Sequence, residues 1–360
     1  MRTFSVALGA RSYPVHVGAG VLDDLGTLAL EAGLRGGRAA VVTDSTVGPL
    51  YLERVAAALD GAKFDPIAIT IAAGEGSKSQ AVLESIYDRL VEAHLERSGT
   101  VFALGGGVVG DLAGFAAATY LRGVPLVQVP TTLVAQVDSA LGGKTGINHR
   151  LAKNLIGAFY EPRMVVADVE TLDTLGEREF REGLAEVIKY GAIMDAPLLD
   201  DLERGRDAIA ARDRHELEQL VERSLRHKAS VVERDEQEAG LRRLLNFGHT
   251  VGHALEASSG YGRYLHGEAV AIGMVAAARL SETYAGLSSA ESERLRALIE
   301  RAGLPVAMPS GWAGEEFAQA LNLDKKRAGD GIEFVLLDRL GHALTHRIGC
   351  DEIITELSDE

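Results

Sequence analysis

Residues 101–154 read VFALGGGVVGDLAGFAAATYLRGVPLVQVPTTLVAQVDSALGGKTGINHRLAKN, and this stretch decides the fold. An apolar run breaks into three consecutive glycines, small residues follow, and a second apolar run ends at Pro130-Thr131-Thr132 before another glycine pair. The pattern predicts strand, tight turn, helix, strand and turn, the unit of an α/β fold with a mostly parallel sheet. Gly105, Gly107 and Gly110 have the G-x-G-x-x-G spacing that lets backbone amides approach a pyrophosphate at a helix N-terminus.

The glycine pattern alone does not establish a nucleotide site, because glycines after a strand also serve as plain turn residues. Ala116–Gln136 contains no acidic residue that could hold a ribose hydroxyl about 20 residues further on, so a standard first-strand Rossmann unit fits poorly. Asp44 instead follows the strand-like run Ala39–Thr43, where an acidic side chain can accept hydrogen bonds from a ribose. Capping of the next helix is an equally good interpretation of Asp44.

The rest of the chain divides into two parts of different periodicity. The first part alternates short apolar runs with helical spacing, whereas residues 177–302 have helical spacing almost throughout. We therefore predict a Rossmann-like α/β domain over residues 1–174 and a mainly α-helical domain over residues 175–360. Hairpins are predicted at both ends, followed by a frayed acidic terminus at 351–360. The predicted hairpin strands are Phe4–Leu8 with Tyr13–Val17, and Ile332–Leu337 with Ala343–Ile348.

Composition excludes several classes of protein. A 360-residue chain with 46% hydrophobic residues can bury a large core, and its formal charge of −15 argues against a nucleic-acid partner. Cys350 is the only cysteine, so an intramolecular disulfide is excluded. The N-terminus has no basic segment followed by an apolar one, and no window approaches 18 uncharged apolar residues. We therefore expect a cytoplasmic protein without a membrane partner.

Glutamate, lysine and histidine recur at helical spacing in the second half. Glu186 and Lys189 are one turn apart on the predicted helix Arg178–Ile193, and an exposed ion pair is the alternative interpretation. His249 and His253 are also one turn apart, and His266 begins the next predicted helix. Two histidines at i and i+4 can face one cation, although most such pairs bind nothing. Spacing alone does not choose which two histidines would join a carboxylate around a metal.

Six longer motifs occur in one order along the chain. They are LGGGVVGDLAGFAAATYLRG (104–123), PTTLVAQVDSALGGKTGIN (130–148), LAKN (151–154), GLAEVIKYG (183–191), LLNFGHTVGHALE (244–256) and HGEAVAIGM (266–274). Together they resemble the 3-dehydroquinate synthases, the NAD- and metal-dependent cyclases of the shikimate pathway within the sugar phosphate cyclase superfamily. The resemblance runs from about Ala39 to the segment Asp324-Lys325-Lys326.

The resemblance implies a dehydroquinate synthase-like fold, with an NAD-binding α/β domain before a helical metal- and substrate-binding domain. It also implies a site for one divalent cation, Zn²⁺ or Co²⁺, formed by Glu186, His249 and His266. The implied catalytic residues are Asp138, Lys144, Lys189, Lys228, Asn246 and His253. The implied substrate-binding residues are Arg122, Lys153, Asn154, Arg242 and one of Lys325 and Lys326, between which the motif does not choose. The implied NAD-binding residues are Asp44, Glu75, Lys78, Gly105, Gly106, Gly107, Val108, Asp111, Thr131, Thr132, Lys144, Lys153, Thr171 and Thr174.

The implied reaction converts 3-deoxy-D-arabino-heptulosonate 7-phosphate to 3-dehydroquinate and phosphate, the second step toward aromatic amino acids. Transient oxidation by NAD is followed by phosphate elimination, reduction, ring opening and intramolecular aldol closure. Arg122 matches a residue that reaches the neighbouring subunit's site, which implies a homodimer. Two other activities remain open: cyclisation of a sedoheptulose or glucose phosphate, and a metal-dependent polyol dehydrogenase of the glycerol type.

Overall fold

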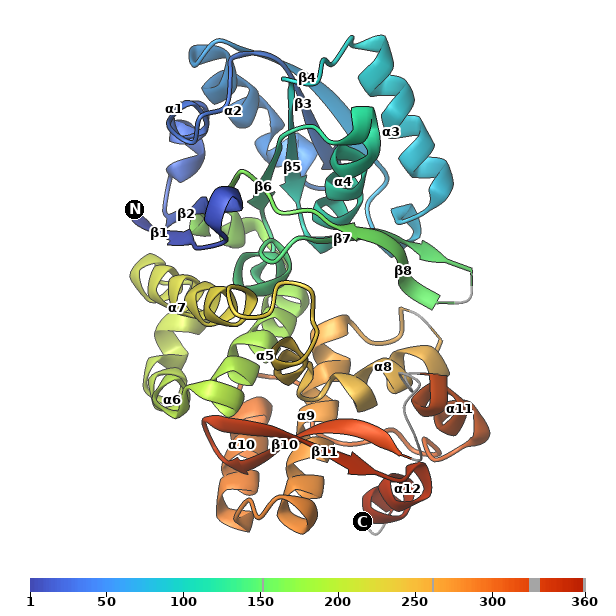
Figure 1. The fold of residues 1–360 in the computed structure, drawn as a ribbon. Helices are drawn as coiled ribbons and strands as arrows, with labels where there is room; N and C mark the ends of the chain where they lie inside the picture. Colours follow the sequence, from blue (N-terminus) through green and yellow to red (C-terminus); the bar gives the residue numbers. More distant parts are fainter. Residues whose placement is uncertain (151, 261, 324–330, 359–360) are drawn as a thin grey trace. The chain divides into compact units, whose positions relative to one another are not determined.

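The computed structural model describes residues 1–150, 152–260, 262–323 and 331–358, and its contacts divide the chain into two units (Figure 1). Unit 1 consists of Met1–Leu175 and Arg212–Gln237, and unit 2 of Gly176–Ala211 and Glu238–Glu360. The sequence-based boundary after residue 174 lies next to the first division, but the segment Arg212–Gln237 differs from the prediction. Its helix α7 (Arg214–Val232) packs against the first two strands and two short helices of unit 1, so it groups with the α/β part.

Unit 1 contains a seven-stranded sheet in the order β1-β2-β9-β6-β5-β3-β4 (Figure 1). All neighbouring pairs are parallel except β1 with β2, which confirms the mostly parallel sheet and the opening hairpin. From β3 the chain moves outward to β4 and then returns to β5 on the other side of β3. The carboxyl ends of β3 and β5 therefore form the switch point where open α/β sheets bind ligands. The strands are β1 (Arg2–Val6), β2 (Tyr13–Gly18), β3 (Gly37–Asp44), β4 (Phe64–Ile71), β5 (Thr100–Gly105), β6 (Leu126–Pro130) and β9 (Met164–Asp168).

Helices cover both faces of this sheet, as its fully apolar inner strands require. Val41 and Phe102 point to one face, where they pack with apolar side chains of α1 and α2. Val42 and Val101 point to the other face and pack with those of α3 and α4. The two-residue period of a strand thus sends alternate residues into two separate cores. The helices of unit 1 are α1 (Leu25–Glu31), α2 (Gly48–Gly61), α3 (Gln80–Glu92), α4 (Gly107–Thr119) and α7.

A second, two-stranded sheet follows the seven-stranded one in unit 1, and sequence patterns had indicated only a turn there. Strands β7 (Lys144–His149) and β8 (Ala152–Phe159) pair antiparallel, and β7 packs on α4. Gly142 and Gly143 precede the hairpin with φ of +92° and +63°, which glycine adopts without strain. The short helices of unit 1 are η1 (Gly9–Arg11), η2 (Val21–Asp24), η3 (Glu75–Ser77), η4 (Tyr120–Arg122), η5 (Ala135–Ser139) and η6 (Val169–Thr174).

Unit 2 is mainly helical and is built around α9, which packs against α5, α8, α10 and β10 (Figure 1). The antiparallel pairing of β10 and β11 confirms the predicted terminal hairpin. The prediction of a frayed terminus is wrong for residues up to 358, because Ile353 and Leu357 are buried one turn apart on α12. The elements of unit 2 are α5 (Glu177–Met194), α6 (Ala196–Ala210), η7 (Leu241–Asn246), α8 (His249–Ser258), α9 (His266–Tyr284), α10 (Ser289–Arg301), α11 (Glu315–Leu323), β10 (Ile332–Arg339), β11 (His342–Ile348) and α12 (Cys350–Ser358).

None of the helices within the described ranges is long and apolar enough to cross a membrane.

Candidate active site

The glycine loop between β5 and α4 is tightly packed, and its glycines are needed for space. Gly106 has an extended backbone with φ −77° and ψ −170°, so a left-handed turn is not the reason for it. A Cβ on Gly106 would lie 2.9 Å from Thr132 Cγ2, and one on Gly110 would lie 2.9 Å from Gln128 Oε1. Gly106 thus packs against Thr132, just after β6, and the first turn of α4 packs against Gln128 in the middle of β6. The loop presents the backbone amides at the start of α4, where a phosphate group is stabilised.

Asp44 lies beside this loop, because the residue before it pairs with Leu104 of β5. Its Oδ1 accepts hydrogen bonds from the backbone N–H groups of Thr46 at 2.8 Å and Val47 at 2.9 Å. The capping role considered from the sequence is therefore present. It engages one of the two carboxylate oxygens.

Threonines predicted to bind the cofactor divide into two groups. Among the described residues, the buried Thr131 hydroxyl has no hydrogen-bond partner, which is unusual for a group of this kind. Thr132 Oγ1 accepts from the Ala135 N–H at 3.3 Å. Thr171 and Thr174 lie on η6, and their hydroxyls bond to Gln136 Nε2 and Tyr51 Oη respectively, so both already have partners inside the protein. The hydroxyl of Thr131 is thus the one best suited to a ligand.

A buried lysine connects the turn after β4 with the β7–β8 hairpin. Lys78, only 5% exposed, donates to Asp111 Oδ2 at 2.7 Å and also to Asn154 Oδ1. Asn148 donates to Glu75 Oε1 at 2.7 Å and accepts the Asn154 N–H at 2.8 Å. Burial raises the pKa of Asp111, although Lys78 opposes that change. The structure therefore brings three predicted cofactor residues together with a predicted substrate residue.

Asn148 is the residue of this network that sequence reasoning missed. It is the last residue of the motif at 130–148, and its membership of that motif was the available signal. The side-chain oxygen Oδ1 of Asn148 accepts the backbone N–H of Asn154. The φ of Asn154 is +55°, which is uncommon outside glycine. Asn148 thus fixes a backbone conformation beside a predicted substrate contact.

Helix α7 brings a buried lysine to Asp138 on η5. Lys228 Nζ donates to the Asp138 carbonyl oxygen at 2.8 Å and lies 3.1 Å from Asp138 Oδ1. This pair joins two predicted catalytic residues within unit 1. Lys144 and Lys153, by contrast, lie at opposite ends of the β7–β8 hairpin, since Lys144 pairs with Phe159 at the far end from the turn.

Arg122 is exposed on η4, directly after α4. The 13 residues of α4 separate it from the glycine loop by about 20 Å, at 1.5 Å per residue. Val108 lies in the first turn of α4, at the opposite end of the same helix. Arg122 is therefore too far along α4 to join the group around the glycine loop of its own chain.

Three helices of unit 2 cross at glycines and thereby bring the predicted metal ligands together. A Cβ on Gly273 of α9 would overlap the carbonyl oxygen of Gly248, which precedes α8 with φ +79°. A Cβ on Gly267 would overlap the carbonyl oxygen of Glu182 on α5. The absence of side chains lets these helices approach more closely than the usual 8–10 Å between axes allows for larger residues. Close crossing places α8 and the start of α9 beside α5.

Glu186, His249 and His266 converge at this crossing. Glu186 Oε1 lies 3.6 Å from Nε2 of His249 and 3.6 Å from Nε2 of His266. One ligand atom from each residue falls within 4.8 Å of the others, which fits a single metal ion. Two imidazoles and one carboxylate around an open position are a donor set typical of catalytic zinc, and Co²⁺ accepts the same ligands.

The pKa values of the two histidines differ because their neighbours differ. Burial lowers the pKa of His249 to about 3; Glu186 opposes this and Lys189 adds to it. Its ring is therefore neutral at pH 7 and offers a lone pair. Burial would also lower the pKa of His266, but the carboxylates of Glu186 and Glu256 raise it to about 10. At pH 7 both ring nitrogens of His266 are therefore protonated in the metal-free protein. Binding of a cation to the ring releases one of these protons.

The remaining predicted residues of unit 2 lie on α5, η7 and α8. Lys189 is buried one turn after Glu186 and forms an ion pair with it. Arg242 is 2% exposed on η7, and Asn246 at the end of η7 donates to Glu238 Oε1 at 3.4 Å. His253 is exposed one turn after His249, with ring centroids 5.4 Å apart. The predicted substrate contacts Lys325 and Lys326 lie outside the described residues.

A second combination of ligands shares one residue with the first. His253, Glu256 and His266 also offer three donor atoms within 4.8 Å of one another. Glu256 Oε2 lies 3.3 Å from Nδ1 of His266, on the opposite side of the ring from Glu186. In the sequence Glu256 is the last residue of the motif at 244–256, and the sequence analysis assigned it no role.

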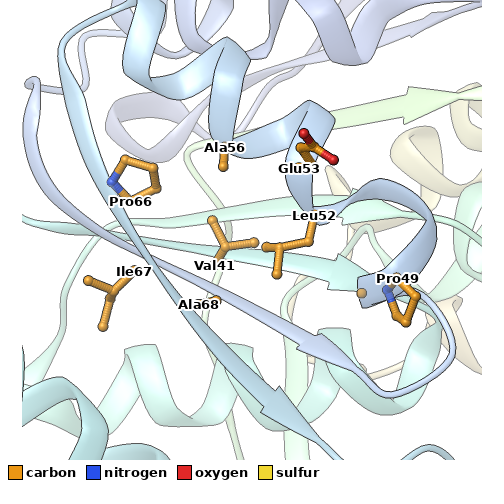
Figure 2. A pocket seen from close by; sticks show the side chains of 9 residues that line it. Val41, Pro49, Leu52, Glu53, Ala56, Pro66, Ile67 and Ala68 are labelled. Carbon is orange, nitrogen blue, oxygen red and sulfur yellow. The ribbon is translucent and has the colours of Figure 1, made fainter.

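One cavity of unit 1 lies apart from all of these residues. It has a volume of about 410 Å³ and lies between α2 and strands β3 and β4, with Val41, Leu52 and Ile67 in its lining (Figure 2). Glu53 is the one charged side chain that lines it. None of the predicted site residues contributes to it, and its apolar wall does not suit an anionic ligand.

Comparison with known proteins places the chain in the class of sugar phosphate cyclases. A solved structure of 2-epi-5-epi-valiolone synthase from Streptomyces hygroscopicus subsp. jinggangensis, with NAD⁺ and Zn²⁺ bound, matches with a TM-score of 0.88 and 31% identity, covering 98% of this chain and 97% of that one. A 2-deoxy-scyllo-inosose synthase complexed with carbaglucose-6-phosphate, NAD⁺ and Co²⁺ matches with a TM-score of 0.87 and 25% identity, covering 99% of each chain. The shared fold confirms the α/β unit followed by a helical one.

Sequence comparison is more specific than the fold. The model of the 3-dehydroquinate synthase N-terminal domain matches residues 68–182, and that of the C-terminal domain matches residues 183–327. A 3-dehydroquinate synthase from Geobacter sp. (strain M21) is 53% identical over 336 residues, covering 93% of this chain and 92% of its own. The chain belongs to the 3-dehydroquinate synthase family.

Proposed function

We propose that this chain converts 3-deoxy-D-arabino-heptulosonate 7-phosphate to 3-dehydroquinate and inorganic phosphate, with no net oxidation or reduction. One observation carries the proposal: Glu186, His249 and His266 converge on one point in a chain that is 53% identical to a 3-dehydroquinate synthase. The same motifs supply the lysine and arginine side chains that an anionic substrate requires. When bound, NAD⁺ and a divalent cation would supply reversible oxidation of one substrate carbon and polarisation of its hydroxyl group.

Unit 1 would bind the dinucleotide. The backbone N–H groups at the start of α4 would hold the pyrophosphate, since the glycine loop leaves no side chain in the way. Asp44 Oδ2 would accept a ribose hydroxyl, because Oδ1 is held by the backbone of residues 46 and 47. The Thr131 hydroxyl and the turn held by Lys78 would complete the contacts.

Each unit offers basic and amide side chains as candidates for contacts with substrate anions. Lys228, fixed by Asp138, and the hairpin residues Lys153 and Asn154 are candidates from unit 1. Lys189 and Arg242 are candidates from unit 2, where each is almost completely buried. A buried cation interacts with an anion more strongly than one in water does.

Proton transfer would fall to His253 in this proposal. His253 is exposed and stands one turn from His249, so a ring nitrogen can exchange protons with substrate and solvent. Asn246, held by Glu238, would orient a substrate hydroxyl or carbonyl by its amide. Neither residue needs to contact the metal ion for these roles.

The proposed reaction is tested by incubating purified protein with the heptulosonate phosphate, catalytic NAD⁺ and Zn²⁺. We expect release of phosphate and formation of dehydroquinate without accumulation of NADH. Glu186→Ala provides the inactive control. Stoichiometric NADH would instead indicate a polyol dehydrogenase, and turnover of sedoheptulose 7-phosphate or glucose 6-phosphate alone would indicate another cyclase.

We propose further that the enzyme is a homodimer in which Arg122 binds substrate phosphate in the partner's site. Its distance of about 20 Å from the glycine loop of its own chain supports this. Loss of a guanidinium that binds phosphate should weaken substrate binding by about 1.5–3 kcal/mol and leave NAD affinity unchanged. Mixing Arg122→Ala with Glu186→Ala protomers should restore activity through heterodimers with one intact site. Verified subunit exchange without a gain in activity would contradict the shared site.

A further inference from the structure

The Glu186 group consists of Glu186, His249 and His266. In each of its two histidines Nδ1, the ring nitrogen that does not face Glu186, lies near an acceptor, and the two acceptors differ. Nδ1 of His249 lies 3.2 Å from the carbonyl oxygen of Phe247. Nδ1 of His266 lies 3.3 Å from Glu256 Oε2. In both residues Nε2 is the nitrogen that faces Glu186. A neutral backbone carbonyl therefore orients one ring and a buried carboxylate orients the other.

We propose that Glu256 is a positioning residue for the metal site, because it accepts the Nδ1–H of His266 and so reserves Nε2 of that ring for the metal ion. The inference rests on the proposed metal site of Glu186, His249 and His266. An imidazole that donates from one nitrogen presents a lone pair on the other, and a carboxylate acceptor makes that lone pair more basic. Glu256 would therefore affect metal affinity without contacting the metal.

The location of Glu256 supports this role. Residues 249, 253 and 256 lie on one face of α8 at helical spacing, so Glu256 stands two turns behind His249. Its side chain is 7% exposed, and a buried carboxylate is costly unless a donor or a cation compensates it. His266 is the donor that the structure places next to it.

Glu256 could instead be a ligand in the second group, with His253 and His266. The two groups cannot both use His266 in the same way, since Nε2 faces Glu186 and Nδ1 faces Glu256. Glu186 is 1% exposed and both imidazole Nε2 atoms point to it, whereas His253 is exposed to solvent. The Glu186 group is the more deeply buried of the two, and both rings present Nε2 to the same carboxylate oxygen, so the geometry favours that group and leaves Glu256 next to Nδ1 of His266.

The test compares Zn²⁺ affinity among variants by competition with a chromophoric chelator. Glu256→Ala removes the acceptor and should weaken binding about 10- to 100-fold, the usual range for residues that orient a ligand. Glu256→Gln keeps a neutral acceptor, and its affinity should fall between those of Glu256→Ala and the unchanged protein. The Co²⁺ absorption spectrum of Glu256→Ala should change, because His266 is no longer held in one orientation, and that of Glu256→Gln should change less.

Glu182→Gln is the matched control. Glu182 is also a half-buried carboxylate beside the start of α9, but its Oε2 accepts the backbone N–H of Gly267 at 3.2 Å and does not hold the ring of His266. This variant and His253→Ala should both keep the affinity of the unchanged protein. Thermal unfolding of the metal-free variants verifies that each is folded, and Glu256→Gln serves if Glu256→Ala does not fold.

Two results would overturn the inference. One is unchanged Zn²⁺ affinity in Glu256→Ala, or in Glu256→Gln where only that variant folds. The other is equal loss in the Glu256 and His253 variants while Glu186→Ala keeps its metal, which would place the ion in the second group. Metal affinity is measured without substrate, so a failure of the dehydroquinate assay leaves this test intact and the two failures can be told apart.

Discussion

The candidate residues of unit 1 and those of unit 2 are held in place by different means. In unit 1 they lie on turns, a hairpin and the helices α4 and α7. They are linked by contacts between opposite charges and amides, such as Lys78 with Asp111 and Lys228 with Asp138. In unit 2 a carboxylate and two imidazoles are carried by three helices that cross at glycines. The first arrangement joins side chains through direct pairs. The second also contains an ion pair, Lys189 with Glu186, but two imidazole nitrogens face the same carboxylate and complete a donor set for a cation.

This difference shows that glycine can serve a binding site in two ways. The glycines at 106 and 110 let the loop before α4 and the first turn of that helix lie close to β6 and the residue Thr132 beyond it. Gly248 and Gly273 let two helices touch, so that histidines 17 positions apart reach the same carboxylate. Loops can adjust to a ligand, whereas side chains on packed helices hold their geometry. We therefore expect mutations in the two regions to fail in different ways.

The largest effect is expected where a metal ligand is removed. Glu186→Ala, His249→Ala and His266→Ala should each weaken Zn²⁺ binding by about 1,000-fold, or about 4 kcal/mol at 1.4 kcal/mol per tenfold, and abolish turnover. Metal content after gel filtration and chelator competition measure this loss. His253→Ala is the control and should keep its metal while it loses rate. Full metal occupancy in His266→Ala would show that a different histidine binds the ion.

In unit 1 the expected loss is of stability. Lys78→Met leaves the carboxylate of Asp111 without its buried cation, which should lower the free energy of unfolding by about 3–5 kcal/mol. Denaturant titration measures the change, and the exposed Lys63→Met is the matched control. Adding Asp111→Asn should recover part of the loss, since the unpaired charge is then gone. Equal stability of Lys78→Met and the control would mean that the turn and the hairpin are held by other contacts.

The smallest expected effect concerns the pH dependence of unit 2 in the metal-free protein. Burial raises the pKa of Glu182 to about 6, although the hydrogen bond from the Gly267 N–H lowers that pKa in part. Because the folded-state pKa is the higher one, this group's contribution to stability is complete below about pH 4.5 and is lost as the pH rises through 6. A shift of this size corresponds to about 2 kcal/mol. Glu182→Gln should reduce the change of the melting temperature with pH between pH 4.5 and 6. An unchanged pH dependence in this variant would assign it to other groups.

Much of the fold could be predicted because it depends on local periodicity. The apolar runs of β3, β5 and β9 and the small-residue helix α4 identified the parallel α/β part. The β7–β8 hairpin was missed, since the glycine pair and the polar residues up to 154 resemble a turn, and the apolar side chains of Leu155, Ile156 and Phe159 in β8 are exposed. The helix α7 was assigned to the wrong part of the chain, because helical spacing gives no information about which unit a helix packs against.

By itself the sequence determined the family, the fold class and a set of residues in which the candidate site lies. Spacing left open which two of His249, His253 and His266 bind the metal ion. Two histidines one turn apart on one helix can face the same ion, and so can one histidine from each of two neighbouring helices. Only the tertiary structure decided that Nε2 of His249 and of His266 lie equally far from Glu186, and that Glu256 stands behind one of them. The physical reason is that spacing fixes which side chains share a helix face, whereas distances between α5, α8 and α9 depend on how closely three separate helices pack.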